Sequence, residues 1–170
     1  SLSNLKTNDQ FGVFEAGMSR AGEIDKLSRL IKPHFGIITN IGEAHIENFN
    51  NLKGIAKAKG EIINNVENGG TVILNRDDKY FNFLSKKAKL FNLKVISFGK
   101  HKKSHILLKK NIEKNGNSKI TASINNRSLN LEFRDINIYN VLASLAVLNA
   151  FKIDVQKIKS VLRNLQPSAG

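Results

Sequence analysis

Short apolar runs alternate with helix-like patterns over residues 11–98. The apolar runs predict buried strands at 11–16, 35–39, 71–74 and 95–98. Between them, apolar positions recur every three or four residues, which predicts helices at 22–31, 52–66 and 79–91. Pro33 ends the first helix, because its ring cannot continue one. Strands that alternate with helices are typical of an α/β fold, a mostly parallel sheet flanked by helices.

The pattern changes after residue 100, where three shorter strands are predicted in succession, at 105–112, 119–124 and 128–133. Asn115-Gly116 and Asn125-Asn126 fall between these strands, and such pairs favour the tight turns of β-hairpins. We therefore expect a small antiparallel β unit appended to the α/β part. Two further helices are predicted at 137–150 and 155–165, the second closed by a proline.

The composition is that of a globular protein with an unusual excess of positive charge. Lys and Arg number 27 against 14 Asp and Glu, which gives a formal charge of +13. The lysines are scattered rather than gathered in one block, and no aromatic RNA-binding motif or zinc-finger spacing accompanies them. A basic nucleic-acid-binding module is therefore the weaker alternative, and no nucleic-acid partner is expected. A protein that handles nucleotide phosphates also tolerates positive charge.

The sequence carries no sign of membrane insertion or secretion. No apolar run approaches the roughly 18 residues that span a bilayer, and the first residues lack the pattern of a signal peptide. The absence of cysteine excludes disulfides and thiolate metal sites. We expect a cytoplasmic protein.

Two side chains that follow predicted strands are candidates for metal binding. Glu15 ends the first strand, where a carboxylate is well placed to bind a divalent cation beside a nucleotide. The alternative for Glu15 is a solvent-facing or helix-capping acid. His45 lies in the loop after the second strand and is compatible with a metal ligand, a general base or a plain loop residue. His34, His101 and His105 have no partner at ligand spacing and are expected at the surface.

Lys59 occupies an apolar position of the helix predicted at 52–66. It follows Leu52 by seven residues, Ile55 by four and Ala56 by three, so it falls on the apolar stripe. A lysine directed inward is costly unless it is paired, neutralised or chemically modified. The alternative is a stem that lies on the core while the ammonium reaches water.

Separated motifs run through the chain in a defined order. They are FEAGMSRAGEI at 14–24, ITNIGEAHIENF at 38–49, IAKAKGEI at 55–62 and LNRDD at 74–78. In order, spacing and strand context they resemble the Mur ligases, the ATP-dependent amide ligases of peptidoglycan precursor synthesis, and the MurF type fits best. The resemblance is close over residues 11–80 and looser to the end.

The resemblance implies roles for the residues singled out above. Glu15 and His45 correspond to family ligands of a magnesium ion, and His45 also belongs to the catalytic set. Lys59 corresponds to a lysine that the family carries as a carbamate, formed with carbon dioxide, which would organise magnesium near the reacting phosphate. Asn40 lies in the same loop as His45 and would help to shape the site.

Residues 134–140 resemble a family segment that opens a helix near the adenine of ATP. The family pattern is Gly-x-His-Asn-x-x-Asn, and this chain has Arg134 and Ile136 in the glycine and histidine places. The surviving residues, Asn137 and Asn140, are implied to contact the nucleotide. Asn137 is equally suited to cap the helix.

The resemblance also implies a domain organisation and a reaction. Residues 1–170 correspond to part of the central, ATP-binding domain, and they contain no Gly-x-x-x-x-Gly-Lys-Ser/Thr P-loop. The family's N-terminal UDP-sugar domain, P-loop and C-terminal domain are expected to be absent, and the chain alone to be inactive. With ATP and Mg²⁺, the parent enzyme would form an acyl phosphate and join D-alanyl-D-alanine to UDP-N-acetylmuramoyl-tripeptide. A monomer is expected.

The nearest rivals are folylpolyglutamate synthase, which shares the fold and the lysine, and the other Mur-type ligases. These relatives usually have Asp before the histidine, where this chain has Ala44-His45. Folylpolyglutamate synthase also has Glu-Lys-Ala-Gly-Ile at the lysine, where this chain has Ala58-Lys59-Gly60-Glu61-Ile62. Both differences favour the MurF type.

Overall fold

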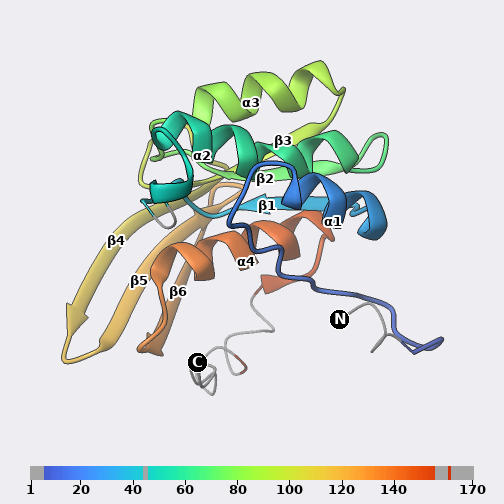
Figure 1. The fold of residues 1–170 in the computed structure, drawn as a ribbon. Helices are drawn as coiled ribbons and strands as arrows, with labels where there is room; N and C mark the ends of the chain where they lie inside the picture. The colour runs from blue at the N-terminus through green and yellow to red at the C-terminus, as the bar shows by residue number, and fades with distance from the viewer. Residues whose placement is uncertain (1–5, 44–45, 156–160, 162–170) are drawn as a thin grey trace.

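The computed structural model describes residues 6–43, 46–155 and 161 of the 170. Its centre is one six-stranded sheet whose spatial order follows the chain, from β1 to β6 (Figure 1). Strands β1 to β4 pair in parallel, and β4 to β6 pair antiparallel. The strands are β1 (Phe35–Ile38), β2 (Thr71–Asn75), β3 (Lys94–Gly99), β4 (Ile106–Lys114), β5 (Asn117–Ile124) and β6 (Arg127–Arg134). The mostly parallel sheet expected from the sequence is confirmed.

Helices cover both faces of this sheet (Figure 1). α2, its 3-10 continuation η3, and α3 lie over one face with α1 beside them, and α4 lies under the other. The helical segments are α1 (Glu23–Ile31), η2 (Ile46–Asn48), α2 (Leu52–Lys59), η3 (Gly60–Asn65), α3 (Phe81–Leu90) and α4 (Ile138–Ala150). The connections from β1 to β2 and from β2 to β3 cross a face of the sheet, and α2–η3 and α3 provide them. Among the described residues, no helix is long and apolar enough to cross a membrane.

The antiparallel unit continues the parallel sheet, because β4 pairs with the end of β3. Both hairpin turns fall where the sequence predicts them. Their backbones are left-handed, with φ of 50° at Asn115, 77° at Gly116, 49° at Asn125 and 64° at Asn126. Glycine and asparagine adopt this conformation at low cost, which explains why these residues lie between the strands. The three strands curve past α4 (Figure 1).

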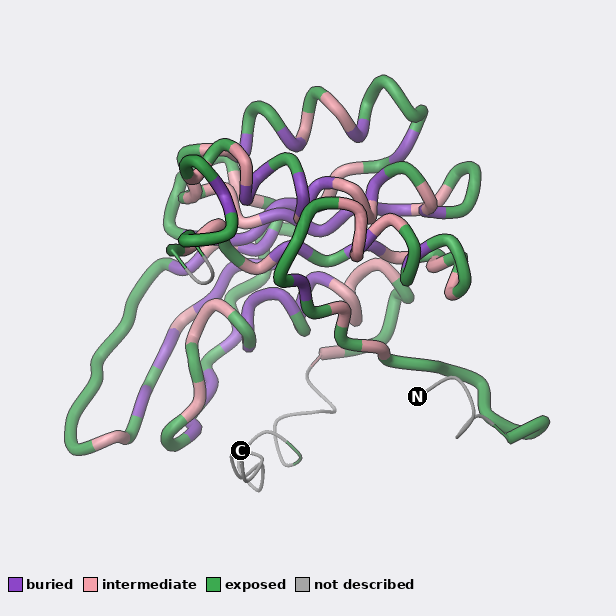
Figure 2. The backbone as a smooth tube through the Cα atoms, viewed as in Figure 1, coloured by how far each residue is buried: buried purple, intermediate pink, exposed green. Residues whose placement is uncertain are grey.

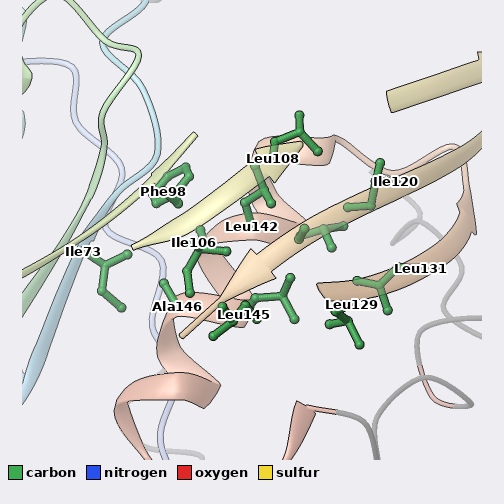
Figure 3. Close-up of a cluster of buried hydrophobic side chains, with 14 of the residues drawn as sticks. Ile73, Phe98, Ile106, Leu108, Ile120, Leu129, Leu131, Leu142, Leu145 and Ala146 are labelled. Atoms are coloured by element: carbon green, nitrogen blue, oxygen red, sulfur yellow. The ribbon is translucent and has the colours of Figure 1, made fainter. Parts of the chain in front are cut away.

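α4 and the sheet face that it covers enclose the largest buried cluster (Figure 3). Leu142 and Leu145 of α4 are 0% and 1% exposed. They share this cluster with Phe98 of β3, Ile106 of β4 and Leu129 of β6. One helix therefore joins the parallel half of the sheet to its antiparallel half.

The opposite face of the sheet has its own core. Val72 and Leu74 of β2 cluster with Ile63 of η3 and Leu84 of α3, while Ile73 belongs to the cluster between α4 and the sheet. Successive strand residues point to opposite faces, so β2 is covered on both sides. The buried positions accordingly gather along the central strands and the inner sides of the helices (Figure 2).

The apolar run at 11–16 does not form the predicted strand. It has no regular secondary structure, and Val13 is 95% exposed. Phe11 instead packs edge-on against Phe151, with ring centroids 5.1 Å apart. An apolar run expresses a tendency to be buried, but a strand also needs a neighbouring backbone to pair with. Within the described residues, β1 pairs only with β2, so the strand prediction at 11–16 is wrong.

The helix predicted at 52–66 is found in place but changes type after Lys59. α2 is α-helical to Lys59, and η3 continues it as a 3-10 helix from Gly60. A side chain at position 60 would meet Leu84 of α3 at 3.0 Å, so glycine permits the close approach of α3. The helix predicted at 137–150 is confirmed as α4, whereas the one at 155–165 lies largely outside the described residues.

Replacing Leu84 by alanine should destabilise the fold far more than the same change at Leu90. Leu84 is 2% exposed inside the α3 core, and Leu90, on the same helix, is 77% exposed. Core Leu→Ala changes cost about 2–5 kcal/mol, whereas surface changes stay within about 0.5 kcal/mol. Urea denaturation of both variants measures the difference in the free energy of unfolding. Equal losses would show that α3 does not pack as described.

Candidate active site at the carboxyl edge of the parallel strands

The loops that follow β1, β2 and β3 meet at the carboxyl edge of the parallel strands. Asp78 after β2 accepts a hydrogen bond from the loop after β1, and Asp77 accepts one from the loop after β3. Ligands of open α/β sheets bind at this edge. The candidate residues from the sequence are therefore expected at this edge.

Lys59 reaches this edge from the last residue of α2. It is half-buried, whereas Lys53 and Lys57 of the same helix are exposed. Its ammonium donates a hydrogen bond to the backbone carbonyl of Asn40, with Nζ 3.0 Å from the oxygen. The position on the more buried side of α2, predicted from helix periodicity, is confirmed, and the ammonium ends on a carbonyl just beyond β1.

Burial lowers the pKa of Lys59, because the ammonium loses hydration. The negative charge of Asp78 opposes this effect and raises the pKa in part. A lowered pKa increases the fraction of neutral amine at a given pH, and the neutral amine is the nucleophilic form of lysine. Lys59 thus has the surroundings of a lysine that can be modified at its nitrogen.

The peptide unit between Asn40 and Ile41 is held from both ends. Its carbonyl accepts the Lys59 hydrogen bond, and its N–H, on Ile41, donates to Oδ2 of Asp78 at 2.7 Å. Oδ1 of Asp78 accepts the backbone N–H of Tyr80 at 2.8 Å, just before α3. Lys59 and Asn40 are therefore brought together through the Asn40 backbone.

Asp77 joins the loop after β3 to the start of α4. Its Oδ2 accepts the backbone N–H of Lys100 at 2.6 Å and the hydroxyl of Tyr139 at 3.0 Å. Its Oδ1 accepts the backbone N–H of His101 at 2.9 Å. Gly99 has φ of 139°, and a Cβ built there would lie 2.6 Å from the Asp77 carboxylate. Only glycine allows this approach.

Asn137 caps α4, since its side-chain oxygen accepts the N–H of Tyr139 at 2.8 Å. The capping alternative is therefore confirmed. The side-chain NH₂ of Asn137 has no hydrogen-bond partner in the part of the chain that the structure describes. Asn137 also lines a cleft of about 360 Å³ together with Lys100, Leu108 and Tyr139. Asn140 follows in the first turn of α4 and is exposed.

Of the two expected metal ligands, the described residues include only Glu15. Glu15 is exposed in the irregular segment before α1, and its side chain makes no hydrogen bond or ion pair within the described ranges. His45 lies outside the described residues. Across residues 6–43, 46–155 and 161, no group of three or more His, Asp or Glu side chains is placed to bind a metal ion. The metal-binding roles of Glu15 and His45 stay predictions.

The other histidines are exposed, as expected, but two of them bind neighbours. Nδ1 of His105 accepts the backbone N–H of Ser97 at 3.1 Å. Partial loss of hydration around the ring, and then the nearby charge of Arg76, lower the pKa of His105, which favours this neutral, accepting form. Nδ1 of His101 accepts a hydrogen bond from Nε of Arg76 at 3.2 Å. Both contacts hold the loop after β3 in place.

Sequence patterns assigned no role to Asp77, Asp78 or Tyr139, although the structure places them at the centre of this edge. One signal is present in the sequence, because Asp77 and Asp78 come shortly after a buried strand, as Glu15 does in the predicted pattern. Their partners come from other loops and from α4, up to 62 residues away along the chain. No local pattern reveals such pairings.

The model of one protein family, the Mur ligase middle domain, matches residues 1–148. The chain belongs to this family. A curated relative from Buchnera aphidicola subsp. Acyrthosiphon pisum, UDP-N-acetylmuramoyl-tripeptide--D-alanyl-D-alanine ligase, is 35% identical over 162 residues. That alignment covers 94% of this chain and 36% of the relative, so the chain spans about a third of that relative's length.

Solved structures of MurF proteins have the same fold as this chain. MurF from Acinetobacter baumannii superposes with a TM-score of 0.89 at 25% identity, over 98% of this chain and 36% of that one. MurF from Thermotoga maritima, solved in complex with ADP, matches in fold with a TM-score of 0.74 at 22% identity, over 89% of this chain and 35% of that one. The resemblance read from the motifs is confirmed.

Tyr139 should titrate above an ordinary tyrosine in this Mur ligase domain. Burial raises the pKa of its phenol, and the hydrogen bond to Asp77 and the Asp77 charge raise it further. Only two tyrosines occur in the sequence, so a Tyr80→Phe variant isolates Tyr139. Its ultraviolet absorbance should report ionisation above pH of about 10, and adding Asp77→Asn should move that ionisation back down.

The same shift fixes the sign of a pH effect on stability. Because folding raises the pKa of Tyr139, its contribution to stability is complete below the unfolded value of about 10. The contribution is lost as pH rises through the folded pKa. Ionisation of the folded Tyr80→Phe variant at the ordinary value, with no response to Asp77→Asn, would contradict the contact.

Proposed function

We propose that this chain is the middle, nucleotide-handling domain of an ATP-dependent ligase that joins D-alanyl-D-alanine to UDP-N-acetylmuramoyl-tripeptide. The family membership and the curated relative with that name support the proposal. Such a reaction forms an acyl phosphate from ATP, which the amine of the dipeptide then attacks. The product is a peptidoglycan precursor.

The observation that carries the proposal is the half-buried Lys59 at the carboxyl edge of the sheet, with its lowered pKa. Its neutral amine would attack carbon dioxide, forming an N–C bond. One C=O electron pair would move to oxygen, and the nitrogen would release a proton to solvent. The product is a carbamate anion, whose oxygens suit Mg²⁺ better than an amine does. The resemblance implies the same modification at this position.

Glu15 and His45 would hold the magnesium ion, as the resemblance implies. The exposed Glu15 carboxylate has no other partner within the described chain and offers oxygen ligands, which this ion prefers. Bound there, magnesium would offset negative charge on the transferring phosphoryl group. Lys59 would contribute carbamate oxygens on the same side, and Asn40 would shape the loop between them.

The nucleotide would lie on the α4 side of the edge, against Asn137 and Asn140. The cleft beside Asn137 has a volume of about 360 Å³, which falls in the range of small-molecule sites. The free NH₂ of Asn137 suits a ring nitrogen of adenine, an acceptor. The Thermotoga maritima protein of the same fold was solved with ADP, which supports a nucleotide in this architecture.

The remaining parts of the ligase are proposed to come from outside these residues. The chain spans about a third of the length of its Buchnera relative, and its sequence contains no P-loop. An N-terminal UDP-sugar domain, a P-loop and a C-terminal domain would complete a monomeric enzyme of the cytoplasm. The 170 residues alone should therefore release no phosphate from ATP when both substrates are supplied.

The intact ligase, assayed with ATP, Mg²⁺ and the UDP-linked tripeptide, should release phosphate only when D-alanyl-D-alanine is present. Chelation of Mg²⁺ should abolish the release. Mass spectrometry of the product tests the new amide bond directly. Phosphate release with folate and glutamate instead, or salt-sensitive nucleic-acid binding without any ligase turnover, would refute the proposed reaction.

Lys59→Arg should lower kcat of the intact ligase by about 100-fold or more, the range for losing a group that stabilises transition-state charge. Arginine keeps the positive charge but cannot form the carbamate. Lys57→Arg is the matched control, because Lys57 is an exposed lysine of the same helix. Carbon-13 NMR with labelled carbon dioxide should show a carbamate signal in the wild type and in Lys57→Arg. A signal that persists in Lys59→Arg would place the modification elsewhere.

A further inference from the structure

Two consecutive aspartates at the end of β2 hold the two sides of the proposed site. We propose that Asp77 and Asp78 are positioning residues that fix the Lys59 side and the Asn137 side of the site relative to each other. This inference rests on the proposed function, because the two sides are named from it. It assigns roles to both residues in addition to the ligands and the lysine already described.

Asp78 fixes the Lys59 side. The peptide unit between Asn40 and Ile41 presents its carbonyl to Lys59 and its N–H to Asp78. A peptide unit is planar and rigid, so binding its N–H also sets the direction of its carbonyl. Asp78 therefore controls where the hydrogen-bond acceptor of Lys59 lies.

Asp78 is itself anchored to α3, because its other oxygen accepts the N–H of Tyr80. Its backbone carbonyl also accepts the N–H of Phe81, at 2.9 Å, where α3 begins. The loop after β1 is thus tied to a helix that packs on the sheet core. Hydrogen bonds from N–H groups to a carboxylate are about twice as strong as neutral ones, which suits such a tie.

Asp77 fixes the nucleotide side. It binds the N–H groups of Lys100 and His101 and the hydroxyl of Tyr139. Tyr139 lies in the first turn of α4, beside the cap formed by Asn137. The loop after β3 and the start of α4 both contribute residues to the 360 Å³ cleft, and one carboxylate holds these two segments.

Because Asp77 and Asp78 are adjacent in the chain, their two sets of hydrogen bonds act together. Consecutive Cα atoms are only about 3.8 Å apart, so a shift of one aspartate moves the other. The turn that carries them is itself braced, since the N–H of Asp77 donates to Oδ1 of Asn75 at 2.9 Å. The N–H of Arg76 donates to the carbonyl of Phe98 at 2.8 Å.

Asparagine substitutions test each tie separately. Each aspartate uses both carboxylate oxygens to accept N–H groups. An asparagine keeps one oxygen and turns the other into an NH₂ donor, which then faces an N–H donor. Asp78→Asn and Asp77→Asn therefore each break one arm with almost no change in side-chain volume.

The two variants should fail in different ways in the intact ligase. Asp78→Asn should lower kcat about 10-fold or more with little change in KM for ATP, because Lys59 and its loop lose their geometry. Asp77→Asn should raise KM for ATP about 10-fold or more with a smaller effect on kcat. Tyr139→Phe removes one arm of Asp77 and should raise KM for ATP less. Asp9→Asn is the control, an exposed aspartate that also accepts one backbone N–H, from Lys6.

Hydrogen exchange gives a readout that does not depend on activity. In Asp78→Asn the amide of Ile41 should exchange at least about 10-fold faster, and in Asp77→Asn the amides of Lys100 and His101 should do so. The β2 amides should stay protected in both variants, which shows that the fold is intact. If the wild type shows these protections but no ligase turnover, the proposed function fails while the two ties stand.

Two results would overturn the inference itself. One is an active wild type whose folded Asp77→Asn and Asp78→Asn variants keep wild-type kcat, KM for ATP and amide exchange. The other is a pair of variants that lose β2 protection and all activity together, which would make both residues parts of the core fold. The opposite split, with kcat lost in Asp77→Asn and KM for ATP raised in Asp78→Asn, would reverse the assignment and equally refute it.

Discussion

Parallel hydrogen bonding between β1, β2 and β3 is the constraint on which the rest of this structure depends. Because the three strands run in one direction, their last residues and the loops that follow come to the same edge. Each return to the start of the next strand must cross a face, and α2–η3 and α3 do so on the same face. The end of α2, with Lys59, is thereby brought to the loop after β1. Residues far apart in the chain meet at one edge for this reason.

Keeping the half-buried ammonium of Lys59 at that edge costs the fold free energy. Its ammonium gives up part of its hydration, and one carbonyl hydrogen bond and the charge of Asp78 offset this only in part, since the pKa stays lowered. An apolar residue at the same helix position would avoid the cost, because Ile55 and Ala56 on the same stripe are fully buried. A titratable group kept in such surroundings is a candidate for a functional site.

Sequence patterns predicted the elements that depend on local burial or local backbone conformation. The continuous apolar run of β2, the left-handed hairpin pairs and the inward position of Lys59 all express short-range physics, and the structure confirms each of them. The run at 11–16 has the same apolar character, but a strand also depends on a partner backbone, and there the prediction is wrong. Sequence patterns could not predict how Asp77 and Asp78 join the loops and α4, because most of their donors lie in other loops and in α4. The motif order identified the family, while the metal-binding roles of Glu15 and His45 are still predictions.

The close packing at Gly99 restricts the substitutions that this domain can accept during evolution. Its backbone angle of 139° and the 2.6 Å approach of Asp77 leave no space for a side chain. A substitution there forces the carboxylate away and releases Lys100, His101 and Tyr139 at once, so it cannot be a small step. Homologous sequences should therefore have glycine at position 99 wherever an acid at position 77 makes these contacts. Relatives that have lost the glycine should have lost the acid as well, and they should hold the start of α4 by a different set of contacts.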